Sequence, residues 1–186
     1  MAVGMTRTFS PDDGLALLAI ARAAIEARVH RRDDPPVPGR PPFIHRAGAF
    51  VTLRRHGALR GCVGQPEPQA PLGAVIVRCA GAAALDDPRF PPVQPEELAA
   101  IHVELSVLTP LVRSAAEEVE VGRHGVLVAR GWRRGLLLPQ VPVEAGWDRE
   151  TFLEAACRKA GLPPDAWRTG ADVFTFEAEI FSESVV

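Results

Sequence analysis

The stretch AFVTLRRHGALRGCVG, residues 49–64, predicts a β-hairpin and sets the class of fold. Two strand-like runs flank the turn residues RHG at positions 55–57, a pattern typical of two antiparallel strands joined by a tight turn. The second run ends in LRGCVG, residues 59–64, where an arginine, a thiol and two glycines replace apolar residues. A strand that gives up packable surface in this way is a candidate functional site.

Outward from the hairpin, the patterns predict both helices and further strands. Ser10 can cap a helix that begins at Pro11, because its hydroxyl can accept from the first free backbone N–H groups. Residues 71–87 are apolar and rich in alanine, which suits a helix buried against a sheet. Strict alternation over residues 101–108 predicts a strand with one polar face.

The C-terminal half shows the same mixture. SAAE at residues 114–117 fits a capping box for a short helix, and residues 125–140 predict a second hairpin. An amphipathic helix is expected from Asp148, and a last strand over residues 172–181. Strands joined by both tight turns and helices, without a regular strand–helix repeat, favour an α+β fold with a largely antiparallel sheet flanked by helices.

Length and composition indicate one globular domain over residues 1–186. The apolar fraction is 47%, and the net charge of -2 lacks the positive field that attracts nucleic acid, so nucleic-acid binding is disfavoured. The N-terminus shows no apolar segment of signal-peptide length, and no apolar run approaches the roughly 18 residues that cross a bilayer. We therefore expect a cytoplasmic protein that does not insert into membranes.

The cysteines and short motifs name neither a metal nor a cofactor. Cys62, Cys79 and Cys157 form an odd set without a CxxC pair or a Cys/His ligand spacing, which argues against a disulfide framework or a structural zinc site. The common motifs for nucleotide, zinc-protease and serine-hydrolase chemistry are absent from the sequence. The sequence therefore predicts no metal site and leaves the cofactor undetermined.

The chemistry of LRGCVG depends on strand alternation. Arg60 and Cys62 are two residues apart, so on a regular strand they project to one face, where the guanidinium favours the thiolate over the thiol. Gly61 and Gly64 leave the backbone bare, which lets a ligand or another backbone approach closely. The alternative interpretation is structural: a packed, inert cysteine, with glycines that mark a bulge or a turn.

Seven separated sequence blocks extend this interpretation. They are FVTL with LRGCVG, AAALDDPRFPPVQPEEL, ELSVLTP, GRHGVLVARG, GLLLPQV, GWDRETFLEAACRKAGLPPDAW and FEAEIF. In this order they closely resemble the AMMECR family, also called AmmeMemoRadiSam system protein A, from about residue 13 to residue 181. The resemblance implies a compact α+β domain of two unequal lobes separated by a cleft, and no established reaction.

The resemblance also implies further site residues and partners. Polar residues at matching positions join Arg60 and Cys62 in the candidate site, and they are Asp87, Arg89, Glu104, Ser106 and Gln140. Each also has a structural interpretation, such as an Asp87–Arg89 pair or a solvated Glu104. Because family members are often encoded beside Memo-like and radical SAM proteins, the resemblance implies these as partners.

Three hypotheses for function follow. The first is a thiol-dependent or small-molecule enzyme in which Cys62 is the nucleophile or redox group, Arg60 holds an anion, and Asp87 or Glu104 handles a proton. The second is a non-catalytic adaptor that binds a Memo-like or radical SAM partner through the motif. The third makes Cys62 or its neighbours the substrate of a modification by such a partner.

Overall fold

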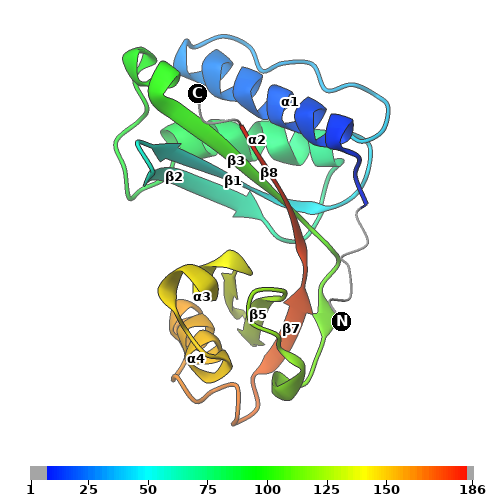
Figure 1. Ribbon diagram of the computed structural model, residues 1–186, viewed down its shortest axis with the longest axis vertical. Helices are drawn as coiled ribbons and strands as arrows, with labels where there is room; N and C mark the ends of the chain where they lie inside the picture. Colours follow the sequence, from blue (N-terminus) through cyan, green and yellow to red (C-terminus); the bar gives the residue numbers. More distant parts are fainter. Residues whose placement is uncertain (1–7, 184–186) are drawn as a thin grey trace. The chain divides into compact units, whose positions relative to one another are not determined.

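The computed structural model describes residues 8–183, and the chain divides into two compact units (Figure 1). Among the described residues, one unit contains residues 8–108 and 179–183, and the other contains residues 109–178. Each combines helices with an antiparallel sheet, so the predicted α+β class is confirmed. No helix within residues 8–183 is both long and apolar enough to cross a membrane. A cleft between two lobes stays a prediction.

The first unit is a four-stranded sheet with helices on one face. Its elements are α1 (Pro11–Val29), β1 (Gly48–Arg55), β2 (Ala58–Gln65), α2 (Leu72–Leu85), the 3-10 helix η1 (Pro95–Ala100), β3 (Ile101–Leu108) and β8 (Ala178–Ser182). The strand order is β2-β1-β3-β8, so β2 and β8 are the edges. Helices α1 and α2 lie side by side and cover the same face of this sheet (Figure 1).

Alternation along the central strands separates a core face from a polar face. Val51 and Leu53 of β1 and Val103 of β3 are fully buried in the cluster that packs under α1 and α2. The intervening residues point the other way, and we call this side the polar sheet face. It carries Thr52 of β1, Cys62 of β2, and His102, Glu104 and Ser106 of β3. The predicted polar face of residues 101–108 is therefore confirmed.

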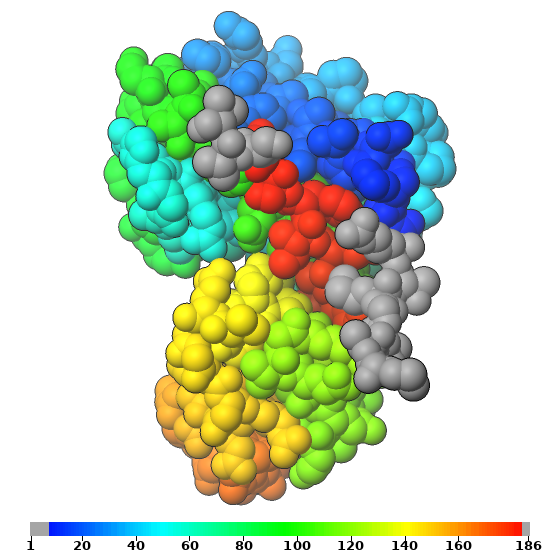
Figure 2. Space-filling model, in the orientation of Figure 1, coloured from blue at the N-terminus to red at the C-terminus, as the bar shows by residue number. Residues whose placement is uncertain are grey.

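Helix α1 begins as the sequence predicts. The Ser10 hydroxyl accepts from the Asp13 N–H at 3.1 Å, and the Asp13 carboxylate accepts from the Ser10 N–H at 3.0 Å, which completes a capping box. Near this start, a Cβ at Gly14 would lie 2.3 Å from the Phe181 ring, so the glycine lets α1 approach β8. Figure 2 shows β8 at the molecular surface beside the start of α1.

The second unit has its own sheet and core. Its elements are β4 (Val112–Arg113), the 3-10 helix η2 (Ala116–Glu118), β5 (Gly125–Arg130), β6 (Arg133–Leu137), α3 (Gln140–Ala145), α4 (Arg149–Lys159) and β7 (Asp172–Phe176). The strand order is β4-β7-β5-β6. Phe152 and Leu153 of α4 pack on Val126 and Val128 of β5, and all four are fully buried. The second hairpin and the Asp148-capped helix are thus confirmed.

Two local predictions in this half are wrong. Residues 172–181 form two strands, β7 and β8, which belong to different sheets, because the backbone of Glu177 turns aside to bond Thr109. The short helix predicted at residues 114–117 forms as η2, but Ser114 does not cap it, since its hydroxyl bonds the Val112 carbonyl and the Thr175 hydroxyl. In addition, α3 forms where the sequence predicted only the end of a strand.

Candidate functional site

Strand β2 contains a β-bulge at Arg60, and this bulge decides where Cys62 lies. The hairpin register runs unbroken from the turn to Leu59, and the pairing then skips one residue so that Cys62 lies opposite Thr52. An unbroken register would place Cys62 opposite Val51, which is a fully buried core residue. The bulge therefore moves Cys62 to the polar sheet face.

Cys62 differs from the other two cysteines in its surroundings. It is partly exposed, and its Sγ accepts a hydrogen bond from the Thr52 hydroxyl at 3.4 Å. Cys79 and Cys157 are buried, and burial raises the pKa of the Cys79 thiol to about 11 and also raises that of Cys157. Cys62 is thus the cysteine best placed to meet a reagent or substrate.

A pair of side chains satisfies the backbone of Cys62 on the open edge of β2. The Cys62 N–H donates to Asp87 Oδ2 at 2.9 Å, and Arg89 Nη2 donates to the Cys62 carbonyl at 3.2 Å. Arg89 also binds both Asp87 oxygens, at 2.9 and 2.6 Å. Together Asp87 and Arg89 occupy the groups that an edge strand leaves unpaired, and they fix the position of Cys62.

The Asp87 carboxyl is held in its charged form. Its side chain is only 3% exposed. Hydrogen bonds from the Arg89 side chain, assisted by the backbone N–H groups of Cys62 and Arg89, keep the pKa of Asp87 well below its ordinary value. Such a carboxylate is a poor proton carrier near neutral pH, so we assign Asp87 to positioning rather than to proton transfer.

Arg60 is engaged in an internal ion pair. Its Nε and Nη2 each donate to Glu97 at 2.9 Å, and its Nη1 donates to the Pro91 carbonyl at 2.9 Å. The Arg60 side chain lowers the pKa of Glu97 to about 2. The regular alternation that would bring Arg60 and Cys62 to one face is interrupted by the bulge, and this corrects the expected pairing of guanidinium and thiol.

The two glycines of the motif accommodate parts of the protein itself. A Cβ at Gly61 would lie 2.1 Å from the carbonyl oxygen of Ala83 in α2, and a Cβ at Gly64 would lie 2.2 Å from the Phe50 ring. The sequence predicted that these glycines admit either a ligand or another part of the backbone. The structure shows that each glycine makes room for another part of the protein.

Glu104 and Ser106 lie on the polar sheet face with Cys62. Thr52 is the register partner of both Cys62 and Glu104, so these three residues form one row across β2, β1 and β3. Ser106 is 1% exposed, and its hydroxyl has no hydrogen-bond partner among the described residues. Gln140 is the first residue of α3 in the second unit, and its place in the site stays a prediction.

Sequence reasoning missed Thr52 and Glu97. Counting residues from the hairpin turn predicts which β1 residue lies opposite Cys62, but a regular register predicts Val51. Only because of the bulge does Thr52 lie there instead. Glu97 is separated from Arg60 by α2 and by a proline-rich loop, and no local spacing links the two.

The fold and the motif strand together define a class of protein. The chain forms two α+β units, and the first carries a cysteine whose backbone is held by an Asp-x-Arg pair. The sequence blocks that contain LRGCVG and DDPRF supply this cysteine and this pair. The AMMECR1 family model matches residues 18–181, and the chain belongs to this family.

Close relatives of the chain are archaeal. A protein of Methanothermobacter thermautotrophicus is 50% identical over 184 residues, covering 94% of this chain and 96% of the relative. Protein TK0174 of Thermococcus kodakarensis is also 50% identical, covering 91% of this chain and 90% of the relative. The crystal structure of the uncharacterized protein PH0010 from Pyrococcus horikoshii has a TM-score of 0.88 at 45% identity, covering 95% of this chain and 94% of that one.

Proposed function

We propose that this protein acts through the thiol of Cys62, in a small-molecule site on the polar sheet face. The observation that carries the proposal is the bulge, which turns Cys62 away from the core and sets its sulfur against the Thr52 hydroxyl. A structural cysteine gains nothing from this departure, because the regular register would bury it among aliphatic side chains.

The neighbouring groups have separate roles in this proposal. The Thr52 hydroxyl donates to the sulfur and so fixes the direction in which the thiol points. Glu104, in the same row, is the group proposed to exchange a proton with the substrate. Asp87 and Arg89 hold the Cys62 backbone, while the Ser106 hydroxyl, in a residue that is 1% exposed, is too deeply buried to meet a ligand directly. Arg60 is not part of the proposed site, because its guanidinium is bound to the Glu97 carboxylate.

Partners and compartment belong to the same proposal. Memo-like and radical SAM proteins are the proposed partners, on the strength of the gene neighbourhood that the family resemblance implies. The proposed compartment is the cytoplasm, which agrees with three unpaired cysteines in the described chain. In the alternative form of the proposal, the protein is an adaptor or a substrate, and Cys62 is the group that such a partner binds or modifies.

Selective alkylation tests the thiol site. Native protein at pH 7 is treated with iodoacetamide, and the rate at each cysteine is read by peptide mass spectrometry. We expect carbamidomethylation at Cys62, while Cys79 and Cys157 stay unmodified until the protein unfolds, because only Cys62 of the three is partly exposed. Thr52→Val should change the rate at Cys62, since the sulfur loses the hydroxyl that bonds it. Reaction at Cys62 that begins only when the protein unfolds, as for the two buried cysteines, would remove the basis of the proposal.

A second measurement separates the enzyme from the substrate form. The chain is produced together with a Memo-like and a radical SAM protein, purified, and weighed intact. An added mass that disappears in Cys62→Ser supports modification by a partner. A bare mass with stable co-purification that survives Cys62→Ser supports an adaptor whose contact lies elsewhere.

A further inference from the structure

The guanidinium of Arg89 has donors that its pair with Asp87 does not use. Its Nε and Nη2 bind the two Asp87 oxygens, and Nη2 also donates to the Cys62 carbonyl. Arginine carries five N–H donors, and the two on Nη1 have no partner among residues 8–183. Because the Arg89 side chain is 54% exposed, these two donors are available to a ligand.

The Asp87 carboxylate holds Arg89 from the buried side. The Asp87 side chain is 3% exposed, and each of its oxygens already accepts two hydrogen bonds. The carboxylate therefore fixes the inner edge of the guanidinium, while Nη1 lies on the other side. An arginine that is held rigidly in this way loses little conformational freedom when it binds an anion.

A backbone N–H lies next to Arg89 on the same edge of β2. The Cys62 N–H points away from β1, because it donates to Asp87. Beyond the bulge the register is regular, so the N–H of Gly64, two residues further on, points the same way. Strand β2 is a sheet edge, and within the described part of the chain the Gly64 N–H has no hydrogen-bond partner. It is a second free donor beside the guanidinium.

These donors lie near the thiol and near another cation. After Asp87, the Cys62 side chain is among the groups that raise the pKa of Arg89, so the thiol and the guanidinium are close together. Arg78 of α2 adds a cation at this end of β2, where its guanidinium binds the neutral side-chain amide of Gln65. An anion bound at Arg89 would therefore lie beside the sulfur.

We propose that the Cys62 site takes small molecules that carry a carboxylate or phosphate group, and that Arg89 Nη1 and the Gly64 N–H bind this group. The inference rests on the proposed function, since it assigns a substrate class to the same thiol. Hydrogen bonds between a guanidinium and an oxyanion are about twice as strong as neutral ones, which disfavours uncharged analogues. Arg89 thus takes the anion-binding role that the sequence predicted for Arg60, which Glu97 already binds.

Alkylation with two reagents of different charge tests this substrate class. Iodoacetate and iodoacetamide both lose iodide to the attacking sulfur, and both need the thiolate, so the ratio of their rates at Cys62 does not depend on the thiol pKa. The reference is the same ratio in urea-unfolded protein. In folded protein we expect iodoacetate to be favoured about three-fold or more over this reference, because its carboxylate binds Arg89. Peptide mass spectrometry measures both rates.

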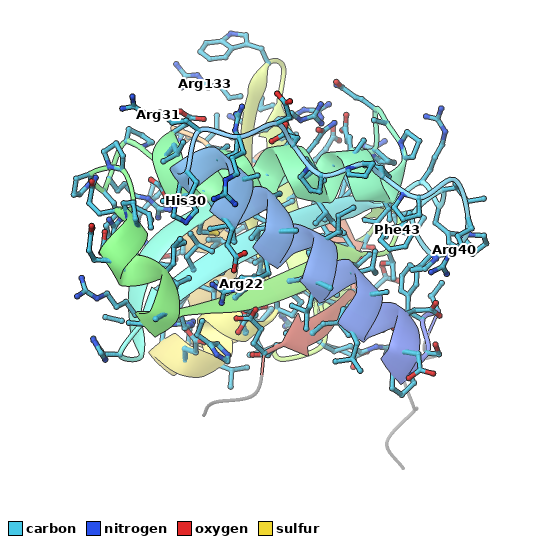
Figure 3. All side chains as sticks on the ribbon, turned by 90° about the horizontal axis from the view of Figure 1, so that it is seen from above. Arg22, His30, Arg31, Arg40, Phe43 and Arg133 are labelled. Atoms are coloured by element: carbon cyan, nitrogen blue, oxygen red, sulfur yellow. The ribbon has the colours of Figure 1, made fainter. Side chains whose placement is uncertain are left out.

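One variant and a matched control assign the effect to Arg89. Arg89→Gln should return the ratio to the reference, because the amide carries no charge. A displaced thiol would change both rates and leave their ratio, so loss of support for Cys62 does not imitate this result. Arg40 is exposed on the loop between α1 and β1 (Figure 3), and Arg40→Gln, which removes the same charge, should keep the ratio of the unaltered protein.

Competition separates two sources of the anionic group. Inorganic phosphate or acetate is added at constant ionic strength, and protection of Cys62 from iodoacetamide is measured. Stronger protection by phosphate supports a phosphate ester as the ligand, and stronger protection by acetate supports a carboxylate. Neither anion should protect Arg89→Gln.

Two kinds of failure are distinguishable. If Cys62 of the folded protein reacts with iodoacetamide, but with the reference ratio and without protection by either anion, the inference is overturned and the proposed function stands. A raised ratio that persists in Arg89→Gln would also overturn it. If Cys62 reacts with iodoacetamide only after unfolding, the inference and the proposed function are both overturned.

Discussion

The two hairpins of the molecule, β1–β2 and β5–β6, use the same packing device in different units. In each, the second strand is a sheet edge and carries a glycine that lies against the backbone of a helix. A Cβ at Gly61 would lie 2.1 Å from the Ala83 carbonyl oxygen of α2, and a Cβ at Gly135 would lie 2.3 Å from the Ala156 carbonyl oxygen of α4. Both glycines therefore permit an edge strand to approach a helix closely.

The hairpins differ in the residue that follows the glycine. After Gly135 comes Leu136, which is 8% exposed. After Gly61 comes Cys62, whose backbone is held by Asp87 and Arg89 and whose thiol lies on the polar sheet face. The comparison shows that the glycine in LRGC is a requirement of packing, while the cysteine and its Asp-x-Arg pair are what distinguish this hairpin as a candidate site.

The largest effect is expected from adding a methyl group at the shared glycine. Gly61→Ala and Gly135→Ala should each destabilise their unit by about 3 kcal/mol, because a backbone carbonyl cannot move aside as a side-chain end can. All three tryptophans, Trp132, Trp147 and Trp167, lie in the second unit, so their fluorescence reports its unfolding in urea. Gly135→Ala should lower the midpoint seen by fluorescence, and Gly61→Ala the midpoint seen by circular dichroism.

Gly39→Ala is the control for both variants. A Cβ at Gly39 meets no heavy atom within 4 Å, so this substitution should change stability by less than about 0.5 kcal/mol. If Gly61→Ala or Gly135→Ala is as stable as the control, the close approach of the glycine to the helix backbone is not required for stability in that hairpin.

The next effect should come from the pair that only the first hairpin has. Asp87→Asn should cost about 2 kcal/mol, because it removes the charge that Arg89 binds and weakens the acceptor of the Cys62 N–H. It should also change the alkylation rate of Cys62, since the strand loses its support. Urea unfolding and peptide mass spectrometry measure the two effects. An unchanged rate with lowered stability would make Asp87 purely structural.

Glu97, the partner of Arg60, should give a smaller effect that depends on pH. Its pKa is lowered to about 2 from an ordinary value near 4.5, so its contribution is complete above about pH 4.5 and is lost as pH falls towards 2. Glu97→Gln should therefore cost about 1 to 2 kcal/mol at pH 7 and much less near pH 2.5. Stability curves of the two proteins that stay parallel from pH 7 to pH 2.5 would contradict this assignment.

The smallest effect is expected at the tip of the second hairpin. Trp132 is 86% exposed, and its ring meets the Arg133 guanidinium at 5.4 Å. Because so little apolar surface is buried, Trp132→Ala should cost about 0.5 kcal/mol. Thermal unfolding followed by circular dichroism checks this, and a loss above about 2 kcal/mol would show that the tip supports the hairpin as its second strand does.

Local signals in the sequence predicted much of the fold. The caps at Ser10 and Asp148 and the hairpin turns act within a few residues; the structure confirms the caps and places the turns at residues 56–57 and 131–132. The division of residues 172–181 between two sheets could not be predicted in this way. It depends on Thr109, which is distant in sequence and bonds the backbone of Glu177.

The candidate site shows the same limit. The sequence and its resemblance named Cys62, Asp87 and Arg89, and the structure brings these three together. Thr52 and Glu97 were missed, because each meets its partner across a strand pair or a loop and not through spacing along the chain.

The sequence by itself determined that this protein is α+β, that a hairpin carries LRGC, and that the chain resembles one family, since caps, turns and motif order are local or linear properties. Only the tertiary structure decided on which side of the sheet the thiol lies. Alternation has a period of two residues, so the single extra residue at Arg60 exchanges the core face for the polar face, and whether a strand bulges depends on what packs against it.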